Sequence, residues 1–218
     1  MDGTLDTPRA EAWIRTLATA VAAHEAELTA LHAAIGDGDH GSNLRRGFDA
    51  VLAALGDVPA ASPGALLTTT GSTLISRVGG ASGPLYGSAF RAVGHALATP
   101  DEEPGSRPPT GAQALAAALA EGLAAVQRLG GAQPGDKTMV DAFAPAVDAF
   151  RAAAGSGTAA AAQAAATAAR KGADATVPLV ARKGRASYLG PRSAGHLDPG
   201  AVSTALLFEA LAEACRED

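Results

Sequence analysis

The sequence predicts an all-α fold of eight helices that run alternately up and down, and three observations support this. The chain has 218 residues, of which 47% are hydrophobic and only 4% are aromatic. Alanine makes up roughly a quarter of the chain, and it favours helix more than any other residue. Apolar residues recur at three- or four-residue steps, without the alternation typical of strands. We therefore expect one helical domain over residues 1–218.

Start and stop signals place the individual helices. The first predicted helix begins at Thr7 and runs past Leu28, and the second begins near Ser42. The remaining six are expected at residues 64–78, 83–98, 111–130, 138–154, 158–181 and 199–215. Pro145 should bend the sixth helix, because a proline inside a helix removes one hydrogen bond. Asp198, followed by a proline, should cap the last helix.

The loops at the two ends of the predicted bundle differ in composition. Short connections bring alternate loops to the same end of an up-and-down bundle. One set consists of proline, glycine and serine spacers, such as residues 99–110 and 155–157. The other set gathers the unusual glycine, aspartate and basic residues, at 36–43, 78–84, 130–137 and 182–200. We therefore expect the ligand site at the second end.

Residues 36–43 have the glycine spacing of a dinucleotide-binding loop, but a helix rather than a strand precedes them. The loop does not match a calcium-binding EF-hand either, because Phe48 stands at the twelfth position counted from Asp37, where an EF-hand needs a glutamate. Asp37 and Asp39 offer the oxygen ligands that suit Mg²⁺, and the following helix presents free N–H groups to phosphate. The alternative is a pair of ordinary Asp-Gly turns.

Two further loops fit a phosphate ligand. Loop 78–84 predicts a second backbone cradle built on its glycines. The last loop has a local basic excess in a chain of formal charge −5, from Arg182, Lys183, Arg185 and Arg192. An arginine there can hold phosphate oxygens with two hydrogen bonds, but any one of these residues can equally be a solvated surface charge. The same two alternatives apply to His40 and His196.

Composition excludes several classes of partner. The charge of −5 and the pI of about 5.5 argue against a nucleic-acid partner. Cys215 is the only cysteine, which excludes an internal disulfide and fits a reducing compartment. No apolar run is long enough to span a bilayer, and the first residues lack the pattern of a secretory signal. We expect a cytoplasmic protein that has no membrane partner.

Four motifs together resemble the nucleotide-binding L subunit of dihydroxyacetone kinase, the DhaL family. They lie, in the order of that family, at residues 35–43, 78–87, 134–141 and 182–201. The resemblance implies an antiparallel barrel of eight helices that binds ADP and two Mg²⁺ at one end. It also implies a partner, the K subunit, which holds dihydroxyacetone covalently through a histidine.

The resemblance also assigns nucleotide-binding roles to matching residues. It places 40–43 and 81–82 against the phosphates, and Gly130 and Met139 beside the adenine or ribose. Arg185 would stabilise charge during transfer, and no covalent protein nucleophile is needed. The implied nucleotide-binding residues are His40, Gly41, Ser42, Asn43, Ala81, Ser82, Gly130, Met139, Arg185, Asp198, Pro199 and Gly200.

The implied metal site departs from the family at one position. Asp37 and Asp39 match its metal-binding aspartates, but a third aspartate usually stands five residues before the first, where this chain has His32. Imidazole is a poor ligand for Mg²⁺ and prefers softer metals. The second metal is therefore held weakly, or a different ion binds, or His32 serves another purpose. A shifted first helix that turns His32 toward solvent is the remaining alternative.

The implied reaction is phosphoryl transfer, in which positioning and charge neutralisation do most of the work. ADP either stays bound and is rephosphorylated by a phosphohistidine-carrying protein of the phosphotransferase system, the M subunit, or exchanges with ATP. The short, separate chain favours the first route. Two rival hypotheses are a kinase subunit for a related ketose such as erythrulose and a non-catalytic module that senses ADP.

Overall fold

The computed structural model describes residues 5–56, 60–98 and 111–216, and within them the regular secondary structure is entirely helical. The predicted all-α class is confirmed. The α-helices are α1 (Thr7–Ala23), α2 (Glu25–Ile35), α3 (His40–Leu55), α4 (Pro63–Arg77), α5 (Ser82–Ala98), α6 (Ala112–Gly130), α7 (Val140–Ala153), α8 (Thr158–Asp174) and α9 (Pro199–Ala214). The 3-10 segments are η1 (Ala154–Ser156) and η2 (Arg185–Ser193), and Gly190 interrupts η2 with φ 55° and ψ −132°. The spacer expected at 99–110 lies outside the described residues.

The first predicted helix is divided into two, because the chain leaves helical geometry at His24. This residue has φ −104° and ψ 11°, and its backbone N–H donates to the carbonyl of Ala20, ending α1. Its ring nitrogen Nδ1 lies 2.9 Å from the same carbonyl oxygen. The side chain therefore shares the acceptor that closes the helix, and α2 begins at the next residue. The prediction of one continuous helix was wrong here.

The seventh predicted helix was too long, since α8 ends at Asp174 rather than near Ala181. The hydroxyl of Thr176 donates to the carbonyl of Ala173 at 2.6 Å, and Pro178 disfavours helix in the residue before it. By contrast, α7 continues through Pro145, as expected. The bend expected there stays a prediction.

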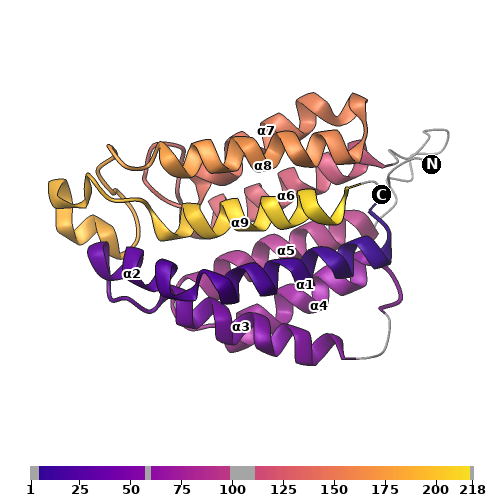
Figure 1. Ribbon diagram of the computed structural model, residues 1–218, viewed down its shortest axis with the longest axis horizontal. Coiled ribbons are helices and arrows are strands. Elements are labelled where there is room, and N and C mark those ends of the chain that lie inside the picture. The colour runs from indigo at the N-terminus through magenta and orange to yellow at the C-terminus, as the bar shows by residue number, and fades with distance from the viewer. Residues whose placement is uncertain (1–4, 57–59, 99–110, 217–218) are drawn as a thin grey trace.

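Consecutive helices pack against one another along the chain, and α1 packs on α9, so the first and last helices are neighbours (Figure 1). Aromatic rings join helices far apart in sequence: Trp13 and Phe90 have centroids 5.6 Å apart, and Phe143 and Phe208 are separated by 5.3 Å. The indole N–H of Trp13 donates to the carbonyl of Leu207 at 2.9 Å, which fixes α1 against α9. These contacts belong to the larger of two buried hydrophobic clusters in the described part of the chain, and the smaller one joins Ile35 to Ala181 and Ala186.

Helices α4 and α5 pack backbone against backbone at glycines. A Cβ added to Gly71 would lie 2.4 Å from the carbonyl oxygen of Gly87, and one added to Gly94 would lie 2.6 Å from that of Gly64. Carbon and oxygen atoms do not approach so closely without a bond, so the helices can keep this separation only with glycine at these positions.

We expect Gly71→Ala to lower the free energy of unfolding by about 1–3 kcal/mol, because the added methyl group forces α4 and α5 apart. Gly155→Ala is the matched control, since a Cβ at Gly155 would meet no atom within 4 Å. Denaturant unfolding of both variants and the parent measures the difference. Equal stabilities for the two variants would contradict the close-packing argument.

The loops that the sequence singled out do gather at one end of the molecule. The connections α2–α3, α4–α5, α6–α7 and α8–α9 lie at the end that carries η2, and α1 begins and α9 ends at the other (Figure 1).

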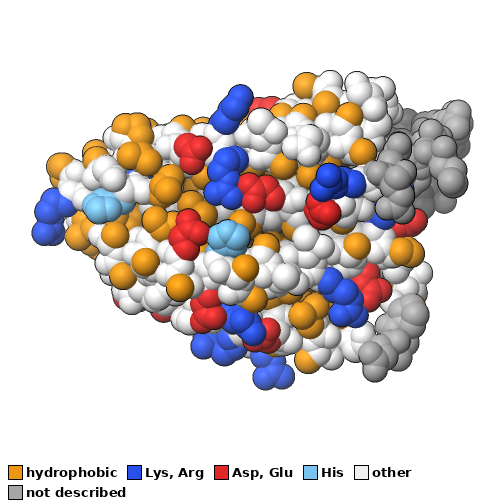
Figure 2. Space-filling view, viewed as in Figure 1, with side chains coloured by type: hydrophobic (Ala, Val, Ile, Leu, Met, Phe, Trp, Pro, Cys, Tyr) orange, Lys and Arg blue, Asp and Glu red, His pale blue; other side chains and the backbone are white. Residues whose placement is uncertain are grey.

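Figure 2 shows acidic and basic side chains interspersed over the visible face, without a patch of one sign. Among the described residues, no helix combines the length and apolar character needed to cross a membrane.

Candidate functional site

A pocket of about 360 Å³ opens at this end, and all four of the unusual loops contribute to it. Its walls combine charged side chains with an apolar part that includes Leu85 and Val126. Most of the residues predicted from the sequence line it: His32, Asp39, His40, Asn43, Ala81, Ser82, Gly130, Met139, Arg185, Asp198, Pro199 and Gly200. The predicted residues therefore meet around one cavity although they come from distant parts of the chain.

Three predicted residues do not line the pocket. Asp37 stands beside it, with a carboxylate oxygen 2.8 Å from Nε of Arg185. Gly41 is buried against α2, where a Cβ would lie 2.1 Å from the carbonyl oxygen of Glu25, so this glycine lets α2 and α3 approach closely. The hydroxyl of Ser42 donates to the carbonyl of Asp39 at 3.1 Å. Backbone contacts of Gly41 and Ser42 with phosphate stay a prediction.

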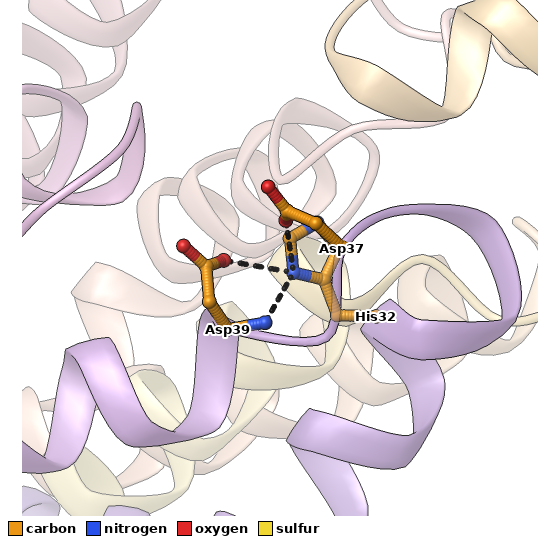
Figure 3. A group of neighbouring side chains, drawn as sticks. All are labelled: His32, Asp37 and Asp39. Atoms are coloured by element: carbon orange, nitrogen blue, oxygen red, sulfur yellow. Dashed lines mark hydrogen bonds and ion pairs between the residues drawn. The ribbon is translucent and has the colours of Figure 1, made fainter.

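His32, Asp37 and Asp39 form a compact cluster at the mouth of the pocket (Figure 3). Nδ1 of His32 lies 3.1 Å from a carboxylate oxygen of Asp39 and 3.6 Å from one of Asp37. The three donor atoms all come within 4.8 Å of one another, which is close enough for a shared metal ion. The side chain of His32 is only 17% exposed, so the imidazole faces the loop rather than solvent.

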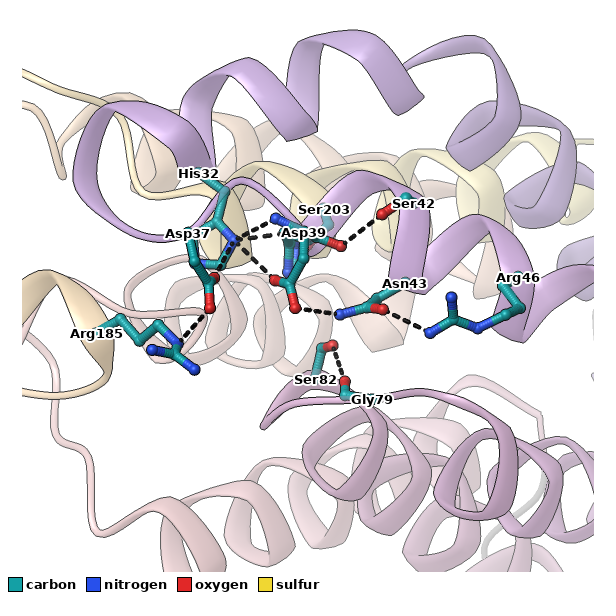
Figure 4. A network of polar contacts seen from close by, with 11 residues as sticks. His32, Asp37, Asp39, Ser42, Asn43, Arg46, Gly79, Ser82, Arg185 and Ser203 are labelled. Carbon is teal, nitrogen blue, oxygen red and sulfur yellow. Dashed lines mark hydrogen bonds and ion pairs between the residues drawn. The ribbon is translucent and has the colours of Figure 1, made fainter.

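A chain of hydrogen bonds leads from this cluster along the start of α3 (Figure 4). The amide of Asn43 donates to the carboxylate of Asp39 at 2.7 Å, and Arg46 donates to the amide oxygen of Asn43 at 2.6 Å. The α4–α5 loop lies next to the same amide, because a Cβ on Gly80 would come within 3.8 Å of it. The N–H groups of Asp39 and His40, where α3 begins, donate to Nδ1 of His32 at 3.3 and 3.2 Å, and the start of α5 also lies at the pocket through Ser82. Such helix N-termini attract anions.

His40 lies under the pocket in a buried polar network. Its Nε2 is 2.9 Å from the hydroxyl of Ser203, which is in turn 2.7 Å from the hydroxyl of Tyr86. Burial, and next the nearby His32, lower the pKa of His40 to about 4, although a hydrogen bond with the carbonyl of Pro199 opposes the shift. The His40 ring is therefore neutral near pH 7 and serves as a hydrogen-bonding group rather than a charge.

Asp198 caps α9 as predicted, since its carboxylate accepts the N–H of Ala201 at 2.8 Å. Burial raises the pKa of Asp198 to about 7, while that hydrogen bond and the charge of Lys137 hold it down. The ammonium of Lys137 donates to the carbonyls of Thr176 and His196. Lys137 thereby ties the α6–α7 loop to the α8–α9 loop and keeps both sides of the pocket together.

We expect Asp198→Asn to change how stability depends on pH in the protein without ligand. Because the folded-state pKa of about 7 lies above the ordinary value of 3.8, the folded state holds a proton that the unfolded state loses between these values. The stability from this proton is complete below about pH 4 and is lost as the pH rises through 7. Asparagine caps a helix equally well and does not titrate here.

Thermal unfolding between pH 4 and 8 tests this expectation. Relative to the variant, the parent should lose stability as the pH rises, and the comparison removes contributions from other groups such as His40. If the melting temperatures of the parent and of Asp198→Asn change with pH by the same amount, Asp198 has an ordinary pKa.

The pocket takes up some of the candidates in the last loop and adds residues that the sequence did not single out. Of the four cations in the last loop, Lys183 and Arg185 line the pocket, but Arg182 instead lies 3.8 Å from the carboxylate of Asp136 and Arg192 is exposed. Lys183 could be anticipated from the sequence, because it belongs to the basic excess of the last loop. Nothing in the sequence indicated that four further residues line the pocket, because they look like ordinary loop or core positions: Ile35, Leu85, Val126 and Thr138.

The fold and the pocket define an all-helical ligand-binding domain whose site is built from the loops at one end. Its acidic and imidazole side chains lie next to the starts of α3 and α5, a combination suited to a metal ion and an anion. The chain belongs to the DAK2 domain family, whose model matches residues 34–213.

The chain is similar to several kinases and kinase subunits. It is 39% identical over 208 residues to the ADP-binding subunit DhaL of PEP-dependent dihydroxyacetone kinase 1 from Listeria innocua, covering 95% of this chain and 96% of that one. It is also 39% identical over 202 residues to L-erythrulose 1-kinase from Mycolicibacterium smegmatis, covering 92% of this chain but 34% of that one.

A solved structure shows the same fold. The crystal structure of the dihydroxyacetone kinase from C. freundii in complex with AMP-PNP and Mg²⁺ matches with a TM-score of 0.66 and 31% identity. The match covers 94% of this chain and 33% of that chain. The present chain therefore corresponds to about one third of that longer kinase and to nearly the whole of the separate DhaL subunit.

Proposed function

We propose that this chain is the ADP- and Mg²⁺-binding subunit of a dihydroxyacetone kinase, and that it transfers a phosphoryl group to dihydroxyacetone held covalently on a separate K subunit. The observation that carries this proposal is the cluster of His32, Asp37 and Asp39 at the mouth of a 360 Å³ pocket. The near full-length similarity to a DhaL subunit supports the same function. Residues 1–218 would form one domain, a barrel of eight helices in which α1 and α2 count as one.

The donor set of the cluster fits a divalent cation. Asp37 and Asp39 would hold Mg²⁺, two ions in all, with His32 standing at the place of a further ligand. When bound, Mg²⁺ neutralises charge on the phosphates and on the group being transferred. The N–H groups at the starts of α3 and α5 would hold phosphate oxygens, as helix N-termini do.

The remaining parts of the pocket suit a nucleotide. Leu85, Val126 and Met139 form an apolar wall next to Gly130, where a flat adenine ring can lie. Asp198 and the turn that follows it close the pocket at the start of α9. Across the mouth, the guanidinium of Arg185 reaches Asp37 from η2, and it would supply a positive charge near the transferring group.

The phosphoryl donor we propose is a phosphohistidine-carrying protein of the phosphotransferase system, the M subunit, acting on resident ADP. The similarity to an ADP-binding subunit of a PEP-dependent kinase supports this route. Exchange of ATP is the alternative, and a related ketose is a second candidate substrate because the chain also resembles L-erythrulose 1-kinase. A panel of ketoses with the cognate K subunit separates the substrates.

The content of the purified protein tests the function directly. After desalting and denaturation, we expect nearly one ADP and about two Mg²⁺ per chain. Little nucleotide after desalting, together with ATP-dependent transfer, would instead establish the exchanging form. Normal ADP binding without any transfer to the K subunit would favour the ADP-sensing module.

A further inference from the structure

The nitrogen Nδ1 of His32 has an unusual set of neighbours. The backbone N–H groups of Asp39 and His40 point at it from 3.3 and 3.2 Å, so this nitrogen acts as an acceptor. Carboxylate oxygens of Asp39 and Asp37 also lie 3.1 and 3.6 Å away. A hydrogen atom on Nδ1 could be donated to the carboxylates, but it would repel the two N–H groups that point at the same nitrogen. Nδ1 has one lone pair in the plane of the ring, so a cation shared with both carboxylates would take that lone pair in place of the two long N–H contacts.

Packing holds the His32 ring in this orientation. A Cβ on Gly36 would lie 2.4 Å from Nε2 of His32, so the ring occupies the space that a side chain at this position would fill. The ring also meets His40 edge to face, with centroids 5.9 Å apart. His32 is therefore fixed with one nitrogen directed at the two carboxylates (Figure 3).

A set of one imidazole nitrogen and two carboxylates does not suit all divalent ions equally. Mg²⁺ is hard and binds almost exclusively through oxygen. Mn²⁺ shares the preference of Mg²⁺ for octahedral sites rich in oxygen, but it is a first-row transition metal and binds a nitrogen ligand more readily than Mg²⁺ does. Replacing an oxygen ligand by imidazole nitrogen therefore raises the preference for Mn²⁺ over Mg²⁺.

We propose that His32 is a metal ligand that makes this site select Mn²⁺ over Mg²⁺. This rests on the proposed function, because it concerns the metal that accompanies ADP in the same pocket. The selectivity comes from one side chain, so His32→Asp should convert the site to one that favours Mg²⁺ more strongly.

Electron paramagnetic resonance of bound Mn²⁺ tests the inference without any transfer assay. Free aqueous Mn²⁺ gives a sharp signal that disappears on binding. Titration of the protein with bound ADP, compared with the same titration of ADP alone, gives Kd for Mn²⁺, and competition gives Kd for Mg²⁺. We expect the ratio of the Mg²⁺ to the Mn²⁺ constant to fall about tenfold in His32→Asp. Pulsed spectra should show coupling to an imidazole nitrogen in the parent and lose it in the variant.

His24→Gln is the matched control, because His24 is a partly exposed histidine beside Glu27 and away from the pocket. It should keep both the ratio and the nitrogen coupling of the parent. An unchanged ratio in His32→Asp, or bound Mn²⁺ without imidazole coupling in the parent, would overturn the role of His32. In that case, a parent protein that still binds ADP with Mg²⁺ would support the proposed function. A parent protein that binds neither divalent metal nor ADP would reject both proposals.

Discussion

Asp37→Asn and Asp39→Asn should each abolish the retention of ADP during desalting while leaving the helical content intact. Each variant removes a negative oxygen ligand from the cluster around His32, so the cation that we propose links the protein to the phosphates would be lost. We expect Kd for ADP in the presence of a divalent metal to rise by about 100-fold or more. Both aspartates are partly exposed, with side chains 39% and 48% accessible, so the fold does not depend on them.

Asp49→Asn provides the control for this pair. Asp49 lies on α3, close in sequence to the cluster, and its exposed carboxylate pairs with Arg45 at 2.9 Å rather than facing the pocket. It should retain ADP as the parent does. Circular dichroism and calorimetric titration on the four proteins give helical content and affinity. Unchanged ADP affinity in both cluster variants would reject the metal-loop account of residues 36–43.

The helices and the position of the site could be predicted from the sequence because both depend on local patterns. Apolar periodicity marked the helices, and the sorting of loops placed the pocket at the correct end. Two helix boundaries could not be predicted. The break at His24 depends on a ring that shares a helical carbonyl, and the end of α8 depends on Thr176, whose hydroxyl bonds both Ala173 and the backbone of Asp198.

Within the site, the features that the sequence could not predict also depend on contacts between residues distant in the chain. Gly41 belongs to a motif that predicts phosphate contact, but the structure also gives it a packing role against α2, which only the three-dimensional arrangement reveals. The orientation of His32 depends on the space left at Gly36. Leu85 and Val126 could not be distinguished from core residues, because a pocket wall and a core have the same apolar pattern.

Arg185→Ala should slow phosphoryl transfer by about 100-fold or more and change ADP retention much less. The guanidinium stands at the mouth of the pocket, 65% exposed, and reaches across from η2 to Asp37 at 2.8 Å. It is therefore placed to act on charge that develops on the transferring group, whereas the apolar residues that we propose hold adenine, Leu85 and Val126, lie on other elements, α5 and α6. Arg185→Lys should restore little of the rate, because an ammonium lacks the planar pair of donors that fits phosphate.

Arg182→Ala separates this role from a general effect of positive charge. Arg182 belongs to the same basic loop, is 73% exposed and does not line the pocket, so its removal changes the net charge equally without touching the site. Transfer rates measured with the cognate K subunit and saturating donor should be close to those of the parent. Equal losses in Arg182→Ala and Arg185→Ala would mean that the loop acts through its charge alone. A large loss of ADP retention in Arg185→Ala, with an unchanged rate per bound ADP, would make Arg185 a nucleotide-binding residue with no part in transfer.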